Sequence, residues 1–198
     1  AQMPDGTTAG GNARGQYATD WQKSRTANTQ VASGNNSTIG GGNRNTASGE
    51  DSTVSGGDLN TANALRATVG GGYNNTASDE YATVGGGQSN TVSGDNATVA
   101  GGNGNTASGG TSFVGGGTNN NTTSPFDTVS GGQNNTASGL RSFVGGGNNN
   151  TASGGNSTVG GGVSNQVDGQ KSVIAGGQSN NIDSNSEYST ITGGLSHI

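Results

Sequence analysis

Residues 45–60 read NTASGEDSTVSGGDLN, and variants of this phrase fill most of the chain. Its one medium-sized apolar side chain is Val54, and most of the rest is Gly, Ser, Thr and Asn. An aliphatic residue recurs at the Val54 position every 15 residues, from Ile39 to Ile174, without a slip. Disordered low-complexity segments do not keep such a register, so the period indicates a repeat architecture.

A second series, mostly alanine, alternates with the first at intervals of 7 and 8 residues and includes Ala47 and Ala62. Each unit therefore contains two similar halves, NTASG and STVxGG, and each half is a short segment bounded by turn residues. The Gly pair in every unit excludes a continuous helix. The sequence predicts an all-β fold, a parallel β-solenoid or β-roll with two strands per coil and about 4.8 Å between coils.

The repeat sets the expected domain boundaries. About eleven units fill residues 30–198, and residues 1–29 form an N-terminal cap that does not fit the repeat. The last unit has two extra residues near Glu187 and Tyr188, which move its aliphatic residue to Ile191. The chain stops just after a repeat at GGLSHI, which predicts a fragment of a longer fibre or a chain trimmed at its C-terminus.

Alternation along a strand predicts which side chains face inward. If Val54 points into the coil, Ser52 does too, and Thr53 points outward. The recurrent Asn, as at Asn45, then lies inside or at a corner. Two explanations for this Asn remain open: a ladder of amides bonded from coil to coil, or a left-handed turn conformation. The Gly pair is expected to supply the positive φ of a tight corner.

Composition excludes several functional classes. Lys and Arg number 7 and the net charge is −5, so no basic patch predicts nucleic-acid binding. No apolar run is long enough for membrane insertion. There is no cysteine, which excludes disulfides and thiolate metal sites.

We also expect no enzymatic activity, cofactor or metal site. The 12 acids show no repeated spacing that would pair them, and the only histidine, His197, lies beside the last residue. The segment GGNGNTASG lacks the aspartate of the Gly-rich calcium repeat. A depolymerase tail spike would need carboxylates in a groove, which the sequence does not place.

The Thr53 position suggests a second buried face. It is Thr in most units but becomes Phe113, Phe143 and Val173 in others. A coil whose interior holds mainly one Val and one Ala buries little apolar surface, so burial of these side chains against other copies would add stability. We predict a homotrimer, intertwined or packed around a shared axis, with Phe113 and Phe143 at the trimer face.

The paired NTASG and STVGGG half-repeats resemble the YadA-like head repeats of trimeric autotransporter adhesins. The opening GGNARGQYATDWQKSRTANTQVASGNNSTIGGG resembles the start of similar repeats in phage tail-fibre and virion-fibre proteins. Together these resemblances cover residues 10–194. They imply a trimeric left-handed β-roll on a virion or cell surface, serving as a rigid spacer with a role in host attachment. The 15-residue period departs from the usual 14-residue adhesin unit.

The cap holds the only Trp of the chain. In the simpler interpretation, Tyr17 and Trp21 plug the first coil, and Arg14 and Arg25 pair with Asp20 or a neighbouring chain. The alternative is an aromatic platform that binds carbohydrate.

Binding specificity is expected where the repeat varies. Large or charged residues replace small ones in the turn after TASG, and these candidate contacts with a receptor or glycan are Leu65, Arg66, Tyr81, Phe126, Leu140 and Arg141. The simpler explanation is that neighbouring chains cover them, or that they are ordinary exposed apolar residues. A different function, ice binding by the regular Thr columns, remains the alternative to a fibre.

Overall fold

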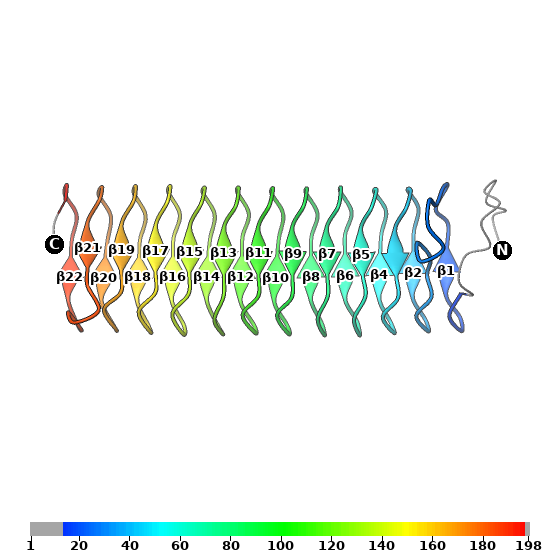
Figure 1. Cartoon of the computed structure of the whole chain (residues 1–198), viewed down its shortest axis with the longest axis horizontal. Helices are drawn as coiled ribbons and strands as arrows, with labels where there is room; N and C mark the ends of the chain where they lie inside the picture. Colours follow the sequence, from blue (N-terminus) through cyan, green and yellow to red (C-terminus); the bar gives the residue numbers. More distant parts are fainter. Residues whose placement is uncertain (1–13, 197–198) are drawn as a thin grey trace. The chain divides into compact units, whose positions relative to one another are not determined.

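The computed structural model describes residues 14–196, and these residues contain 22 two-residue strands and no helix. They form a parallel β-solenoid of about 12 turns, which confirms the predicted fold class. The chain divides into two compact units, residues 1–101 and 102–198, called here the N-terminal and C-terminal units. Figure 1 shows how strands of successive coils lie side by side within a unit.

Each coil gives one strand to each of two sheets. In the valine sheet the inward residue is mostly Val or Ile, and in the alanine sheet it is mostly Ala. Strands pair in parallel with the next coil, so that Thr53 lies opposite Thr68. In the N-terminal unit the valine sheet contains β1 (Thr19–Asp20), β2 (Thr38–Ile39), β4 (Thr53–Val54), β6 (Thr68–Val69), β8 (Thr83–Val84) and β10 (Thr98–Val99). Its alanine sheet contains β3 (Thr46–Ala47), β5 (Thr61–Ala62), β7 (Thr76–Ala77) and β9 (Thr91–Val92).

The C-terminal unit has the same construction. Its valine sheet contains β12 (Phe113–Val114), β14 (Thr128–Val129), β16 (Phe143–Val144), β18 (Thr158–Val159), β20 (Val173–Ile174) and β22 (Thr190–Ile191). Its alanine sheet contains β11 (Thr106–Ala107), β13 (Asn121–Thr122), β15 (Thr136–Ala137), β17 (Thr151–Ala152), β19 (Gln166–Val167) and β21 (Asn181–Ile182). Ile191 pairs with Ile174, so the two extra residues are absorbed before β22 as predicted.

The predicted facing of the strands is confirmed. Val54 and Ala62 are fully buried between the two sheets, and Ser52 is buried beside them. Thr53 and Thr61 point outward and are half-buried. Because the interior is only two side chains thick, small residues let the sheets approach closely while the valine methyl groups fill the remaining space.

The recurrent Asn forms an internal amide ladder. Asn60 donates its backbone N–H to the side-chain oxygen of Asn45 at 2.9 Å. Its Nδ2 donates to the carbonyls of Gly56 at 3.0 Å and Gly72 at 2.9 Å. The left-handed conformation belongs to the preceding residue, Leu59, with φ 60°. The ladder explanation is therefore right, and the turn explanation for this Asn is wrong.

The second Gly of each pair sits at a corner that excludes a side chain. Gly72 has φ +90°, and a Cβ there would lie 2.1 Å from the carbonyl oxygen of Gly87. This close approach places the Gly carbonyls where the Nδ2 of Asn60 and Asn75 can reach them. The Gly pair and the Asn therefore depend on each other.

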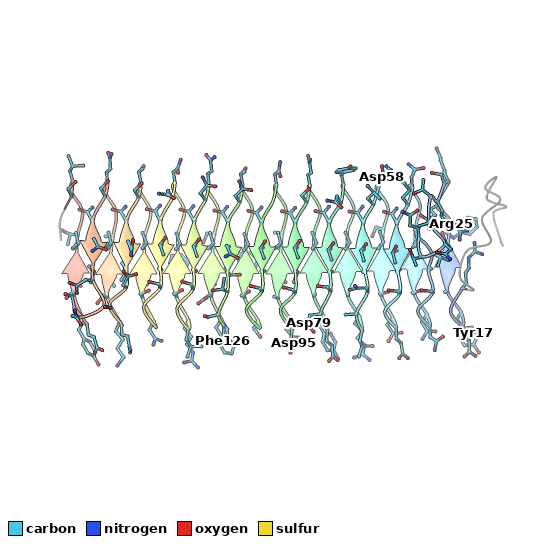
Figure 2. The ribbon with its side chains drawn as sticks, viewed as in Figure 1. Tyr17, Arg25, Asp58, Asp79, Asp95 and Phe126 are labelled. Atoms are coloured by element: carbon cyan, nitrogen blue, oxygen red, sulfur yellow. The ribbon has the colours of Figure 1, made fainter. Side chains whose placement is uncertain are left out.

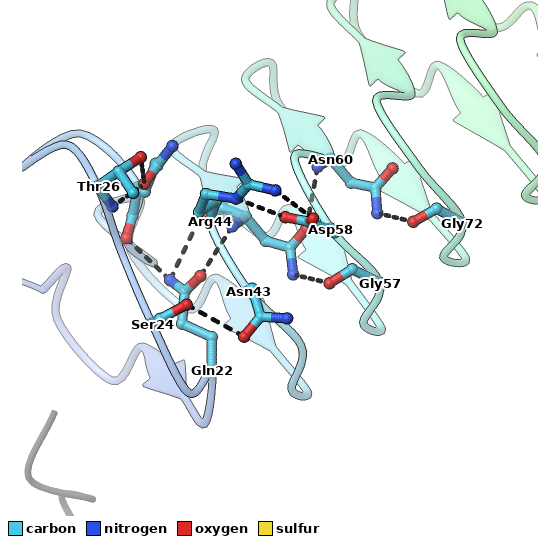
Figure 3. A network of polar contacts seen from close by, with 11 residues as sticks. Gln22, Ser24, Thr26, Asn43, Arg44, Gly57, Asp58, Asn60 and Gly72 are labelled. Atoms are coloured by element: carbon cyan, nitrogen blue, oxygen red, sulfur yellow. Dashed lines mark hydrogen bonds and ion pairs between the residues drawn. The ribbon is translucent and has the colours of Figure 1, made fainter. Parts of the chain in front are cut away.

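Residues 14–29 form a further turn of the solenoid. β1 pairs with β2 in the register of the repeat, which places Asp20 opposite Ile39. Gln22 begins the amide ladder, because its Oε1 accepts from the backbone N–H of Asn45 at 2.7 Å and its Nε2 donates to the Gln30 carbonyl at 2.8 Å (Figure 3). The rest of the expected cap, residues 1–13, lies outside the described residues, as does His197.

The expected aromatic plug is not there. Tyr17 is 81% exposed and Trp21 is 40% exposed, so neither closes the first coil. Asp20 and Gln22 occupy the interior instead. The Asp20 carboxylate accepts hydrogen bonds from the backbone N–H groups of Gln22 at 3.2 Å and Ala32 at 3.3 Å. A polar network satisfies the open backbone groups of this coil better than two aromatic rings, which have few or no donors and acceptors to offer them.

Candidate functional site

Two turns per coil carry the exposed variable side chains. One turn follows the alanine sheet and is called the aromatic edge; the other, which contains the Gly pair, is called the glycine edge. In the N-terminal unit, Figure 2 places Tyr17, Asp79 and Asp95 on one side of the coils and Asp58 on the other. The aromatic edge includes a residue with positive φ in each coil, such as Arg66 at 55° and Tyr81 at 55°.

Hydrogen bonds between coils fix the spacing of these turn residues. The backbone N–H of Arg66 donates to the Glu50 carbonyl at 2.8 Å, and that of Tyr81 donates to the Leu65 carbonyl at 3.0 Å. Because each turn is bonded to the turn before it, the side chains stack one per coil. Side chains 15 residues apart in sequence are therefore direct neighbours, about 4.8 Å apart along the stack.

The structure brings three of the predicted site residues together in the N-terminal unit. The guanidinium of Arg66 lies 5.3 Å from the centre of the Tyr81 ring and donates to its hydroxyl. Its Nε is 3.5 Å from the carboxylate of Asp51. The hydrogen bond to Tyr81 is the main cause that raises the pKa of Arg66 above its usual value. Leu65 is half-buried beside this group.

The other three predicted residues meet in the C-terminal unit. Arg141 stacks 5.4 Å from the centre of the Phe126 ring, and Leu140 is exposed next to it. Phe126 lies on this unit's aromatic edge (Figure 2). Among the described residues, no carboxylate pairs with Arg141 as Asp51 does with Arg66. The two clusters therefore differ in net charge although both stack a guanidinium on a ring.

Two further pairs were missed at the sequence level. Lys171 donates to the Tyr188 hydroxyl at 2.7 Å and lies 4.8 Å from the centre of its ring. This hydrogen bond is the main cause that raises the pKa of Lys171. Lys171 occupies the same turn position as Arg66 and Arg141, which is the signal that would have identified it. On the glycine edge, Arg44 Nε donates to Asp58 Oδ1 at 2.8 Å (Figure 3).

A buried carboxyl lies beneath Phe126. Asp127 replaces the inward Ser of the repeat and is fully buried. It accepts hydrogen bonds from the backbone N–H groups of Ser124 at 2.8 Å and Ser142 at 2.9 Å, and from the Ser142 hydroxyl at 3.0 Å. Burial raises the pKa of Asp127, because the charged form loses its hydration.

The outer faces of the valine sheets differ between the units. In the N-terminal unit the outward residues are all Thr, and they lie in register (Thr19, Thr38, Thr53, Thr68, Thr83 and Thr98). In the C-terminal unit, Phe113 and Phe143 replace Thr and are 40% and 38% exposed. Phe113 pairs with Thr128, which pairs with Phe143, so the two rings are separated by one coil.

Comparison with known proteins gives no relative: no protein family matches the chain, and neither does any curated protein sequence. Within residues 14–196 there is no group of three or more His, Cys, Asp or Glu that could hold a metal ion. The described residues also contain no helix long and apolar enough to cross a membrane.

Proposed function

We propose that this chain is a non-catalytic structural segment of an extracellular fibre, on a virion or a cell surface, that assembles as a homotrimer. The single observation that carries this proposal is the pair of exposed rings of Phe113 and Phe143. They lie on the outer face of the valine sheet, and their own chain leaves them more than a third exposed. Burial of two Phe side chains per chain in an assembly would contribute about 3–6 kcal/mol.

The fold supports a spacer role. Every coil repeats the same backbone hydrogen bonds, so the sheets resist bending and present their faces at fixed spacing. The half-repeats that resemble those of trimeric adhesins and fibre proteins favour the same function. In this proposal the turn edges remain exposed in the trimer and carry the contacts with a host receptor or glycan.

Sedimentation equilibrium of the purified chain tests the assembly. We expect the mass of three chains, and a lower mass when both rings are replaced by the Thr of neighbouring coils, in Phe113→Thr with Phe143→Thr. Phe126→Thr is the matched control, because it removes a similarly exposed ring from an edge and should leave the mass unchanged. A stable monomer at micromolar concentration would contradict the proposal.

The uninterrupted Thr column of the N-terminal unit favours a second candidate, an ice-binding surface. Its hydroxyl and methyl groups repeat in register about every 4.8 Å on a face without charge. Ice binding predicts thermal hysteresis in the purified chain that is lost when Thr68 is replaced by Tyr. The same replacement of Thr158 in the C-terminal unit should change it little. Absence of hysteresis would exclude this candidate and leave the fibre proposal unaffected.

A further inference from the structure

The aromatic edge of the C-terminal unit presents a symmetrical row of side chains. In successive coils the row runs Phe126, Arg141, Asn156, Lys171 and Tyr188, and all five have positive φ and are exposed. Each cation therefore has an aromatic ring on its outer side, and the amide of Asn156 lies between the two cations.

Backbone hydrogen bonds hold this row in place. Arg141 N–H donates to the Pro125 carbonyl at 3.1 Å, and Asn156 N–H donates to that of Leu140 at 2.8 Å. Lys171 N–H donates to the Gly155 carbonyl at 2.9 Å. The cations are thus two coils apart, about 10 Å at the usual strand spacing. Because the backbone of this row is already ordered, ligand binding would cost little conformational entropy of the backbone.

The aromatic rings orient the cations without neutralising them. Phe126 is uncharged and lies 5.4 Å from the Arg141 guanidinium, and the Tyr188 hydroxyl accepts from Lys171 at 2.7 Å. The acids of these turns are Glu187, beside Tyr188, and Asp168 and Asp183, which directly follow β19 and β21. Asp168 is hydrogen-bonded to Ser153 and Gln166, Asp183 to Asn185 and Ser186, and Asp127 is buried. Arg141 and Lys171 are the only cations of the C-terminal unit, so its positive charge is confined to this row.

The corresponding edge of the N-terminal unit is more acidic. There Arg66 is paired with Asp51, and the other charged residues of these turns are Arg14 and four acids, Glu50, Asp79, Glu80 and Asp95. An anionic ligand therefore meets a cation already paired with a carboxylate at Arg66, whereas among the described residues no carboxylate pairs with Arg141 or Lys171. This contrast supports a local site rather than a general affinity of the chain for anions.

We infer that the row from Phe126 to Tyr188 binds an acidic polysaccharide that carries carboxylate or sulfate groups on alternate sugars. Arg141 and Lys171 would each contact one anionic group through charge-assisted hydrogen bonds. The Asn156 amide would bond hydroxyl groups of the intervening sugar, and the rings of Phe126 and Tyr188 would pack on the apolar faces of the flanking sugars. The row is exposed and linear, which suits an extended polymer better than a compact small molecule.

This inference rests on the attachment role proposed above but not on the trimer. The test is titration of the purified chain with size-fractionated heparin, with polygalacturonate as an unsulfated acid and dextran as a neutral polymer. We expect binding of heparin or polygalacturonate, or of both, that weakens with salt, and no binding of dextran. Arg141→Ala or Lys171→Ala should weaken binding about threefold to fivefold, and the double variant by about tenfold or more.

Matched variants make the outcome specific. Phe126→Ala and Tyr188→Ala should each weaken binding, whereas Arg66→Ala, which removes the equivalent cation of the N-terminal unit, should not. Equal binding by the Arg141→Ala/Lys171→Ala double variant, or no binding of either acidic polymer, would overturn the inference. So would single-stranded DNA that binds as tightly as heparin, since that would show attraction to any polyanion. Sedimentation of the same samples reports assembly separately, so failure of this site is distinguishable from failure of the trimer.

Discussion

The N-terminal and C-terminal units have interiors of the same construction and different surfaces. In both, Asn and Gly residues form the same ladder, with Asn60 and Asn150 each donating to two Gly carbonyls. Outside, the valine sheet of one unit shows only Thr and that of the other includes Phe113 and Phe143. The Asn and Gly residues of the interior therefore determine the repeating backbone, whereas the outward positions can vary and carry function.

The largest loss of unfolding free energy is expected at the Gly corners, which both units contain. Gly72→Ala and Gly147→Ala would each place a Cβ 2.1 Å from a carbonyl oxygen of the next coil, at φ +90° and +89°. We expect a loss of more than about 4 kcal/mol of unfolding free energy in either unit. Urea unfolding followed by circular dichroism measures it. The controls are Gly56→Ala and Gly131→Ala, where a Cβ meets open space, and a similar cost in the controls would contradict the steric argument.

The second-largest loss of unfolding free energy is expected when an Asn of the amide ladder is replaced, and it should be equal in the two units. Asn75→Ala leaves the backbone N–H of Asn90 and the carbonyls of Gly71 and Gly87 without their side-chain partner. Asn150→Ala does the same in the C-terminal unit. We expect each to cost about 3 kcal/mol in the same unfolding assay. Asn63→Ala, on an exposed outer face, is the control; unequal losses in the two units would show that the interiors are not equivalent.

Asp127 makes the interior of the C-terminal unit depend on pH. Its pKa is raised by burial, so the folded state holds the proton more tightly than the unfolded chain. Protonation therefore favours folding below the folded pKa, and this advantage is lost as the pH rises from the ordinary Asp range through the raised pKa.

We expect Asp127→Ser, which restores the repeat residue, to gain stability relative to the natural chain between pH 4 and pH 7. Each unit of pKa shift corresponds to about 1.4 kcal/mol. Thermal unfolding at several pH values measures the change. Constant relative stability over this range would show that the carboxyl does not titrate differently on folding.

The smallest effect is expected at the inward Ser position. The hydroxyls of Ser52 and Ser157 are buried without a hydrogen-bond partner, whereas Ala67 and Ala82 occupy the same position in other coils. Ser52→Ala and Ser157→Ala should each stabilise their unit by up to about 1 kcal/mol. Neither substitution changes a titrating group, so both also serve as controls for the pH experiment. Destabilisation in either unit would indicate that the hydroxyl is satisfied in solution.

The sequence was sufficient for the repeating part of the fold. A period of 15 residues and strict alternation determine that Val54 is inside and Thr53 outside, because a solenoid coil has only two faces. The candidate receptor contacts are predicted from the sequence one by one, and their role stays a prediction; the pairing of Arg66 with Tyr81 and of Arg141 with Phe126 is not predicted. That Arg66 reaches Tyr81 depends on the left-handed turn and on side-chain rotamers, which the repeat pattern does not specify.

The arrangement of residues 14–29, the first turn of the solenoid, could not be predicted from the sequence for a different reason. Gln22 takes the place of an Asn at the start of the ladder although it lies 23 residues before Asn45, outside the 15-residue register. Tyr17 and Trp21 are predicted to close this coil because the end of a solenoid exposes unpaired strand edges that must be covered. The first coil has backbone N–H and C=O groups that need hydrogen-bond partners. Polar side chains that can donate and accept hydrogen bonds, Asp20 and Gln22, therefore fill it.

The amide ladder also has a direction, which bears on how the chain acquires its structure during synthesis. In the N-terminal unit each side-chain oxygen, from Gln22 through Asn45 to Asn75, accepts from a backbone N–H of the coil that follows it. The Nδ2 of each of these Asn residues also donates to a carbonyl of the following coil, as Asn60 does to Gly72, so the ladder bonds of a coil are complete only when the next coil is in place. We expect vectorial folding within this unit, with pulsed hydrogen exchange showing protection first in the earliest coils; simultaneous protection of all coils would argue against it. Because each Asn side chain reaches forward to the next coil, a folded coil would then hold the coil translated after it, and the order of translation would become the order of folding.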